Sequence, residues 1–413
     1  MPRPIRVPLP ALVAPAAVST ALALRPIRRP FAAATGGWVV SLPALEVPLH
    51  IGALVGAATA TALGRRERRP SDVVGAGMAA LTCAGLGLVL ARHLAARPAL
   101  DRALREGAPG DGALQDGTEG RGTTTTTSPA PRHRTPWPTV LARPWPLPPH
   151  GVRARRGMVY GPDPVANRFD LYTRADLRPG GDGGAGSRAG EFGAGVGGVR
   201  GVLVHIHGGH FRAGAPSRES RAMLFDHARR GWAAISATYT LSPTPEAGFP
   251  QHLVDIKRLL YWIRVEGPSH GIPADAPIVV AGSSAGAHIA MMTALTANDP
   301  RFQPGFEHVD TTLAAAVGLY GYYGRLGSAT RDVSDPVRHP ASGAPPVAII
   351  HGVLDTYTPV KGSRRLVRHL RAGSPNPVIY AELPGAQHGF DVVCSPRYLA
   401  VVDAVARFTD RYA

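Results

Sequence analysis

The sequence predicts an α/β fold, a mostly parallel sheet with helices on both faces, preceded by an N-terminal helical membrane region. Within residues 151–413, short apolar segments typical of buried strands alternate with segments of helical periodicity. Polar, glycine-containing turns follow several of these strands, where parallel sheets bind their ligands. The first hundred residues are instead apolar and rich in alanine, which indicates membrane helices.

Residues 1–105 contain the apolar stretches 7–24, 38–63 and 73–94. A membrane helix needs about 20 apolar residues, so we expect two or three transmembrane helices; the first stretch is marginal because three prolines interrupt it. A cleavable secretory signal is the alternative for this first stretch, but an arginine cluster and more apolar sequence follow it, which favours a retained anchor. Glu46 and His50 are expected at a helix–helix contact or the membrane interface, and a functional role for them stays open. The predicted location is the cell membrane, with a multi-pass anchor.

Residues 106–150 are expected to form a disordered linker, because Gly, Asp, Thr and Pro dominate and little apolar surface could be buried. The α/β domain is therefore expected over residues 151–413. The glycine-rich segment 179–198 is interpreted as a long hairpin loop between two strands. The strands are expected at residues 167–172, 201–206, 232–239, 277–281, 313–319, 346–351 and 378–382, and the helices at 217–230, 249–265, 285–297, 360–371 and 399–412.

The formal charge of +16 does not indicate a nucleic-acid partner. Lys257 and Lys361 are the only lysines, and the arginines are spread through every segment. Phosphate binding requires basic side chains gathered on one face. We therefore expect no nucleic acid among the partners.

The sharpest motif is Gly282-Ser283-Ser284-Ala285-Gly286, which follows an apolar strand and precedes a helix. A G-x-S-x-G sequence in this context is typical of a nucleophile elbow. The sharp turn exposes the central hydroxyl, and small neighbours let the strand and the helix pass closely. The helix N-terminus favours the negative charge that develops beside the serine. The spacing assigns the nucleophile to Ser284 rather than to Ser283.

A nucleophilic serine needs a base and an orienting carboxylate. Asp355 and His388 each lie in the loop after a predicted strand, and the chain order Ser, Asp, His is the one this arrangement requires. We predict a catalytic triad of Ser284, Asp355 and His388. Asp335 and Asp391 are rival acids, but the first has no strand ahead of it and the second is too close to His388 in sequence.

A turn rich in glycine and histidine, running from His205 to His210, follows an earlier strand. The backbone N–H groups of Gly209 and His210, with Gly208 as a third candidate, are expected to form an oxyanion hole together with Ala285. Three histidines could suggest a metal site, but no carboxylate or further histidine stands at ligand spacing. Neither a metal nor a cofactor is expected.

From about residue 159 to its end, the chain resembles the hormone-sensitive-lipase-like esterases of the α/β-hydrolase fold, in particular bacterial members with an apolar N-terminal membrane anchor. The matching segments are His207–Gly209, the Ser284 elbow, Asn298–Pro304, Leu319–Tyr323, His351–Asp355 and Pro384–Phe390. The resemblance implies an eight-stranded, mostly parallel sheet and hydrolysis of carboxylic esters without cofactor or metal. The chain departs from the family at His210, where a third glycine is usual, and at Ser283, where the usual aspartate and its buried charge are missing. The family's soluble N-terminal cap is expected to be replaced by the linker and the anchor.

The expected function is that of a serine carboxylic-ester hydrolase that works through an acyl-enzyme on a small-molecule or lipid ester, held at the membrane by its N-terminal region. Because no predicted catalytic residue precedes it, a chain that begins near Arg143 is expected to keep this activity. An amidase, formamidase or acyltransferase with the same triad stays open. So does a catalytically inactive, membrane-tethered binding module on the same fold.

Overall fold

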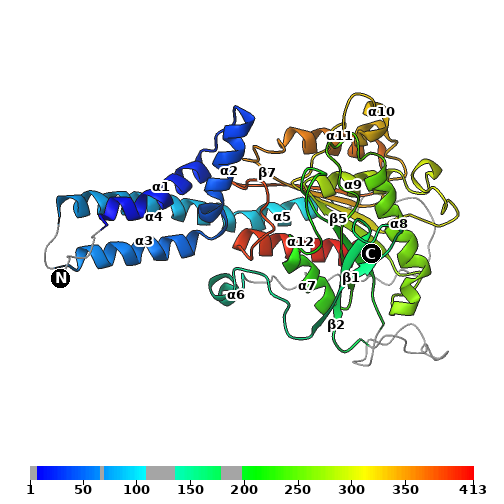
Figure 1. Ribbon diagram of the computed structural model, residues 1–413, viewed down its shortest axis with the longest axis horizontal. Coiled ribbons are helices and arrows are strands. Elements are labelled where there is room, and N and C mark those ends of the chain that lie inside the picture. The colour runs from blue at the N-terminus through cyan, green and yellow to red at the C-terminus, as the bar shows by residue number, and fades with distance from the viewer. Residues whose placement is uncertain (1–6, 66–68, 108–134, 178–197) are drawn as a thin grey trace, which may run out of the picture.

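A sheet of eight strands, in the order β1-β2-β4-β3-β5-β6-β7-β8, organises the C-terminal part of the computed structural model (Figure 1). The structure describes residues 7–65, 69–107, 135–177 and 198–413. Strands β3 to β8 run parallel, whereas β1 and β2 are antiparallel to their neighbours. The mostly parallel, eight-stranded sheet is therefore confirmed. The strands are β1 (Val152–Val159), β2 (Arg168–Arg174), β3 (Val202–Ile206), β4 (Ala233–Ala237), β5 (Ile278–Ser283), β6 (Ala315–Leu319), β7 (Val347–Gly352) and β8 (Val378–Leu383).

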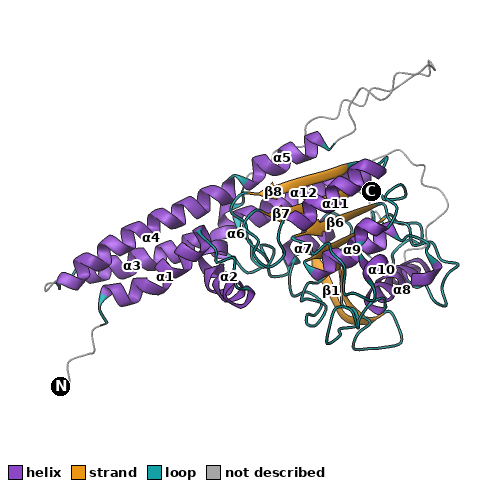
Figure 2. Cartoon of the chain, turned by 90° about the horizontal axis from the view of Figure 1, so that it is seen from above, coloured by secondary structure: helices purple, strands orange, loops and turns teal. Residues whose placement is uncertain are grey.

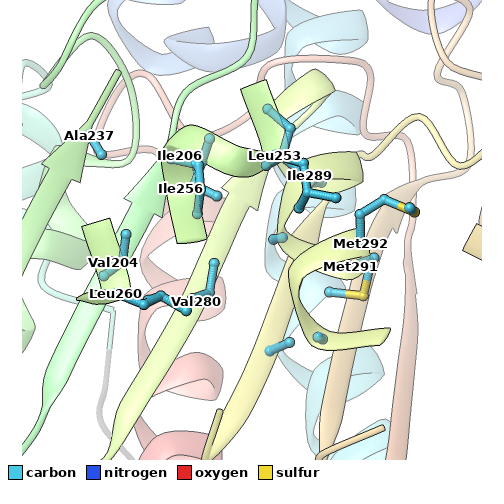
Figure 3. Packing of buried hydrophobic residues seen from close by; sticks show 14 of the residues in the cluster. Val204, Ile206, Ala237, Leu253, Ile256, Leu260, Val280, Ile289, Met291 and Met292 are labelled. Atoms are coloured by element: carbon cyan, nitrogen blue, oxygen red, sulfur yellow. The ribbon is translucent and has the colours of Figure 1, made fainter. Parts of the chain in front are cut away.

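Helices cover both faces of this sheet, because successive side chains of a buried strand point to opposite faces. Val280 faces the layer of α8 (Gln251–Val265), α9 (Ala285–Leu295) and α11 (Lys361–Gly373). Val279 faces the layer of α5 (Ala96–Glu106), α7 (Arg221–Arg229) and α12 (Pro396–Tyr412). Figure 3 shows part of the first layer, in which Ile206 of β3, Ile256 of α8 and Ile289 of α9 belong to one buried cluster. The short helix α10 (Arg331–Ser334) follows β6 and precedes β7 along the chain.

Two expectations about the strands are wrong. The strand β1 was not predicted, because its side chains are exposed or half-buried and include three arginines, so no apolar alternation marks this edge strand. The segment 179–198 falls almost wholly outside the described residues, but it does not connect a hairpin. It joins β2 to β3, and β4 lies between these strands in the sheet.

Four apolar helices precede the catalytic domain. They are α1 (Leu9–Leu24), α2 (Phe31–Glu46), α3 (Pro48–Leu63) and α4 (Pro70–Leu94). Helices α1, α3 and α4 pack along one another and extend away from the sheet (Figures 1 and 2). Among the described helices, one of 37 residues, Pro70–Glu106, is long and apolar enough to cross a membrane. The number of helical segments that could cross a membrane rises to two if the bent pair α2 and α3 is taken as one span.

The helical region differs from its prediction in two ways. The apolar stretch 38–63 is not one straight helix, since it bends by 82° between Glu46 and Pro48, where the proline begins α3. As a result α2 turns away from α3; it packs against α1 and also reaches the catalytic domain, where Trp38 contacts His388 (Figure 1). In addition, α5 belongs to the core of the catalytic domain, where Leu100 is buried against the sheet.

The segment predicted to be a linker is described only at its ends, because residues 108–134 lie outside the described part of the chain. Within the described part, the short helix α6 (Trp137–Ala142) lies where the linker was expected. The ring of His50 contacts the carbonyl oxygen of Leu141 at 3.0 Å, which connects α6 to α3.

Candidate active site

The nucleophile elbow joins β5 to α9. Ser284 has φ 55° and ψ −113°, a conformation that is strained for any residue with a side chain. The neighbouring glycines allow the turn to be this tight. A Cβ atom on Gly282 would lie 2.1 Å from the Gly286 carbonyl oxygen, and one on Gly286 would lie 2.1 Å from the Ile206 carbonyl oxygen. The motif is therefore a steric requirement of this strand, turn and helix.

The structure brings the three residues of the predicted triad together. His388 Nε2 lies 2.9 Å from Ser284 Oγ, and His388 Nδ1 lies 2.8 Å from Asp355 Oδ2. All three side chains are buried. This chain of hydrogen bonds can pass a proton from the serine hydroxyl to the imidazole, with the carboxylate fixing the tautomer.

The loop after β7 holds Asp355 in place. Its Oδ1 accepts hydrogen bonds from the N–H groups of Tyr357 (2.9 Å) and Thr358 (2.7 Å), and its Oδ2 accepts one from the Thr358 hydroxyl (3.0 Å). Burial by itself would raise the pKa of Asp355, but His388 and His351 hold it well below its usual range. The carboxylate therefore stays ionised at neutral pH. The role of Thr358 was not predicted, although an aspartate whose side chain accepts backbone N–H groups two or three residues on is typical of such a turn.

Neither rival acid contacts His388. Asp335 accepts hydrogen bonds from Arg365 (2.7 Å) and from the Val337 N–H (3.3 Å), so it stabilises a loop. Asp391 is directed to the other side of the elbow, where its Oδ2 lies 2.7 Å from the hydroxyl of Ser283.

The surroundings of Ser283 correct one expectation drawn from the sequence. A buried carboxyl group stands beside the nucleophile after all, but Asp391 supplies it from a distant part of the chain. The hydroxyls of Ser220 and Tyr320 also donate to Asp391, and His205 Nε2 lies 3.0 Å from Ser283 Oγ. Burial, together with the nearby charge of Glu219, raises the pKa of Asp391 to about 6.

The turn after β3 lies against the nucleophile, since a Cβ atom on Gly208 would be 2.9 Å from Ser284 Cβ. The Gly208 N–H donates to the carboxylate of Glu219, so Gly208 cannot serve as the third oxyanion donor. The N–H groups of Gly209 and His210 have no hydrogen-bond partner within the described part of the chain. Ala285 is the first residue of α9, where N–H groups lack an intrahelical partner. Gly209, His210 and Ala285 thus remain as candidate donors.

His210 occupies a backbone position suited to glycine. Its φ is 59°, and the preceding Gly209 has φ 119°. The His210 side chain is exposed and lines a cavity beside Ser284. Within the described residues, no three His, Cys, Asp or Glu side chains are placed to hold a metal ion.

A cavity of about 390 Å³ opens beside Ser284. Its wall is mainly apolar and aromatic, with a few polar side chains at the rim. The lining residues are Phe31, His210, Phe211, Thr244, Pro245, Glu246, Ser284, Ala285, Tyr322, Arg325, Leu326, Gly327, Tyr357 and Thr358. Such a cavity suits the acyl or alcohol portion of an ester.

Helix α2, which belongs to the region expected to take the place of a cap, borders this cavity through Phe31. Trp38 Nε1 donates a hydrogen bond to the carbonyl oxygen of His388 at 2.8 Å, and the two rings lie edge to face, 5.5 Å apart. Phe31 and Trp38 also contact the ring of Tyr357, with centroids 5.3 and 5.7 Å away. No local sequence pattern predicts these contacts, since Trp38 and His388 are 350 residues apart along the chain.

Comparison with known proteins agrees with this geometry. The probable carboxylic ester hydrolase LipM of Mycobacterium tuberculosis is 31% identical over 423 residues, which cover 95% of this chain and 90% of LipM. The chain belongs to the hormone-sensitive-lipase-like carboxylesterase family. The expected family is thus confirmed, and the similarity of this family member to LipM extends into the N-terminal helices.

Other comparisons cover less of this esterase chain. A family profile named BD-FAE matches residues 196–324. Esterase LipQ of M. tuberculosis is 32% identical, with 60% of each chain covered. Thermogutta terrifontis esterase 2 phosphonylated by sarin has a similar fold, with a TM-score of 0.50 and 21% identity over 63% of this chain and 94% of that one.

Proposed function

We propose that this protein is a serine carboxylic-ester hydrolase in which Ser284 is the nucleophile, His388 the general base and Asp355 the orienting acid. The observation that carries the proposal is the hydrogen-bond chain from Ser284 through His388 to Asp355, at 2.9 and 2.8 Å, beside an apolar cavity. The ester hydrolase and esterase names of LipM and LipQ support the same reaction class.

The reaction proceeds in two acyl-transfer steps. His388 Nε2 takes the Ser284 proton while Oγ attacks the ester carbonyl carbon, and Asp355 stabilises the imidazolium. The N–H groups of Gly209, His210 and Ala285 stabilise the tetrahedral oxyanion. His388 then protonates the departing alcohol, which leaves an acyl-enzyme, and a water molecule activated by the same histidine releases the acid.

The N-terminal helices are proposed to anchor the enzyme at the cell membrane. The support is the 37-residue helix that contains α4, which is the one described helix that is long and apolar enough by itself to cross a membrane. The described helices therefore do not provide the two or three separate spans expected from the sequence. The substrate would be a small-molecule or lipid ester, and resistance of the full chain to extraction by carbonate tests the anchor.

One assay tests the reaction class. The full-length protein in detergent is given an ester and an amide with the same acyl group, and Ser284→Ala serves as the control. We expect turnover of the ester, slower turnover of the amide and none by Ser284→Ala. Faster amide turnover would favour an amidase. Equal rates for the wild type and Ser284→Ala would favour an inactive binding module.

A further inference from the structure

Helix α2 has two apolar faces. Its inner face carries Trp38, which contacts the catalytic histidine. On its outer face every exposed residue is apolar: Phe31, Ala32, Gly36, Val39, Val40 and Pro43. Val39 and Val40 expose 52% and 47% of their surface. Helices whose outer face meets water carry polar side chains there, so the outer face of α2 is suited to an apolar partner.

The surroundings of α2 identify that partner as a lipid bilayer. The exposed apolar surface continues onto the bundle, where Leu12, Leu54 and Leu81 expose between 48% and 78% of their surface. Helix α2 packs against α1 but is turned by 82° from α3, which packs along α4, so α2 runs along the membrane surface when α4 crosses the membrane (Figure 1). Arg28 and Arg29 are exposed in the loop just before α2, which suits contact with lipid headgroups.

Phe31 connects this outer surface to the active site. It lines the cavity beside Ser284, yet 59% of its surface is exposed. The rim of the cavity is therefore continuous with the apolar face of α2. An acyl chain that passes along this rim keeps apolar surroundings, whereas a route through water exposes each methylene at a free-energy cost.

We propose that the outer face of α2 lies in the interfacial layer of the membrane while Phe31, at the N-terminal end of the helix, lines the pocket, so that esters with bilayer-dissolved acyl chains enter from the lipid. This proposal rests on the proposed esterase function and adds the substrate class and the route. It assigns the bilayer, rather than a second copy of the chain, as the partner of α2.

Kinetics with two esters of one alcohol test the route. The full-length protein is placed in vesicles of phosphatidylcholine and phosphatidylglycerol, and its rates are compared on water-soluble 4-nitrophenyl butyrate and bilayer-dissolved 4-nitrophenyl palmitate. In Val39→Glu/Val40→Glu, two carboxylates oppose seating of α2 in lipid. We expect the palmitate rate to fall about tenfold or more, with the butyrate rate kept within about twofold.

The matched control is Val165→Glu/Val265→Glu, at positions of the catalytic domain that are 70% and 47% exposed, and it should change neither rate. An unchanged palmitate rate in the α2 variant, or equal losses on both esters, would overturn the proposed route. If the wild type hydrolyses butyrate but not palmitate, only the route fails. If it hydrolyses neither ester, the esterase function itself fails.

A spin label gives a readout that does not depend on activity. A nitroxide is attached at Val39→Cys in a Cys83→Ala background, since Cys83 is exposed and Cys394 is buried. In vesicles this label should be more accessible to oxygen than to a polar nickel complex, and a label at Val165→Cys should show the reverse. Equal nickel accessibility at both positions, or dipolar broadening from a second labelled chain, would overturn the proposal.

Discussion

Trp38 offers the sharpest test of how the helical region acts on the triad. Its indole N–H holds the carbonyl of His388, and its ring packs against Gly389, where a Cβ atom would lie 3.4 Å from Trp38 Cζ2. Trp38→Phe keeps an aromatic ring and deletes the donor, whereas Trp38→Ala deletes both. Both variants alter a residue that positions the catalytic histidine without touching substrate.

The expected size of each effect follows from the contacts that are lost. A neutral hydrogen bond contributes about 0.5–1.5 kcal/mol, so Trp38→Phe should lower kcat by about two- to tenfold. Aromatic pairs contribute about 0.5–1.5 kcal/mol each, and Trp38→Ala also loses its contacts with the rings of His388 and Tyr357. The three contacts together contribute about 1.5–4.5 kcal/mol, so we expect a kcat loss of about 10- to 10³-fold for Trp38→Ala.

The assay measures kcat and KM for a short-chain ester together with the thermal unfolding midpoint. The KM of a short ester should change little, since positioning of His388 affects the chemical step more than ground-state binding. Trp145→Phe is the matched control, because Trp145 is 56% exposed and lies in the loop before β1. If kcat stays at the wild-type value in both Trp38 variants, α2 does not position the catalytic histidine.

Three further predictions concern the site. Ser284→Ala, His388→Ala and Asp355→Asn should each lower kcat by about 10⁴-fold or more with little change in the unfolding midpoint, and a double variant should be scarcely worse than a single one; a fully active Asp355→Asn would show that another acid orients the base. His210→Gly should keep most of the activity because its φ of 59° suits glycine, whereas His210→Pro, which deletes the N–H, should cost about 10²–10³ in kcat; a dead His210→Gly would assign the imidazole a catalytic role. Burial raises the pKa of Asp391 to about 6 in the folded protein, so folding favours the protonated carboxyl group. The contribution of Asp391 to the stability of the fold is therefore complete below the ordinary pKa of an aspartate and is lost as the pH rises through 6. The unfolding midpoint of Asp391→Asn relative to the wild type should therefore be higher at pH 8 than at pH 5, and a pH-independent difference would contradict this reasoning.

Local patterns made the elbow and the triad predictable. A buried strand, a tight turn and a helix N-terminus fall within nine residues around Ser284, and the positions of Asp355 and His388 after their own strands follow from sheet geometry. The strand β1 was not predictable in this way, because it lies at the edge of the sheet. Its arginines face solvent there, and burial does not select apolar residues.

Long-range contacts were not predictable in this way. The Glu219 carboxylate that binds the Gly208 N–H, and the Asp391 carboxyl beside Ser283, come from other parts of the chain. The apolar composition of residues 31–46 predicts burial or membrane contact but not a helix that contacts the catalytic histidine.

These contacts also change one expectation. A chain that begins near Arg143 would lose Trp38 as well as α5, whose Leu100 is buried in the catalytic core. We therefore expect such a chain to be less stable and less active than the full-length protein, rather than equally active. Unfolding midpoints and short-chain ester rates of the two chains compare them directly.

Covalent labelling tests the central claim most directly. A fluorophosphonate probe reacts with a serine activated by a neighbouring base, and intact mass followed by peptide mapping identifies the modified residue. The geometry of the elbow predicts one adduct per chain on Ser284, with no labelling of Ser284→Ala and strongly reduced labelling of His388→Ala. An adduct on Ser283, or no adduct on protein that still hydrolyses esters, would contradict the assignment of the nucleophile.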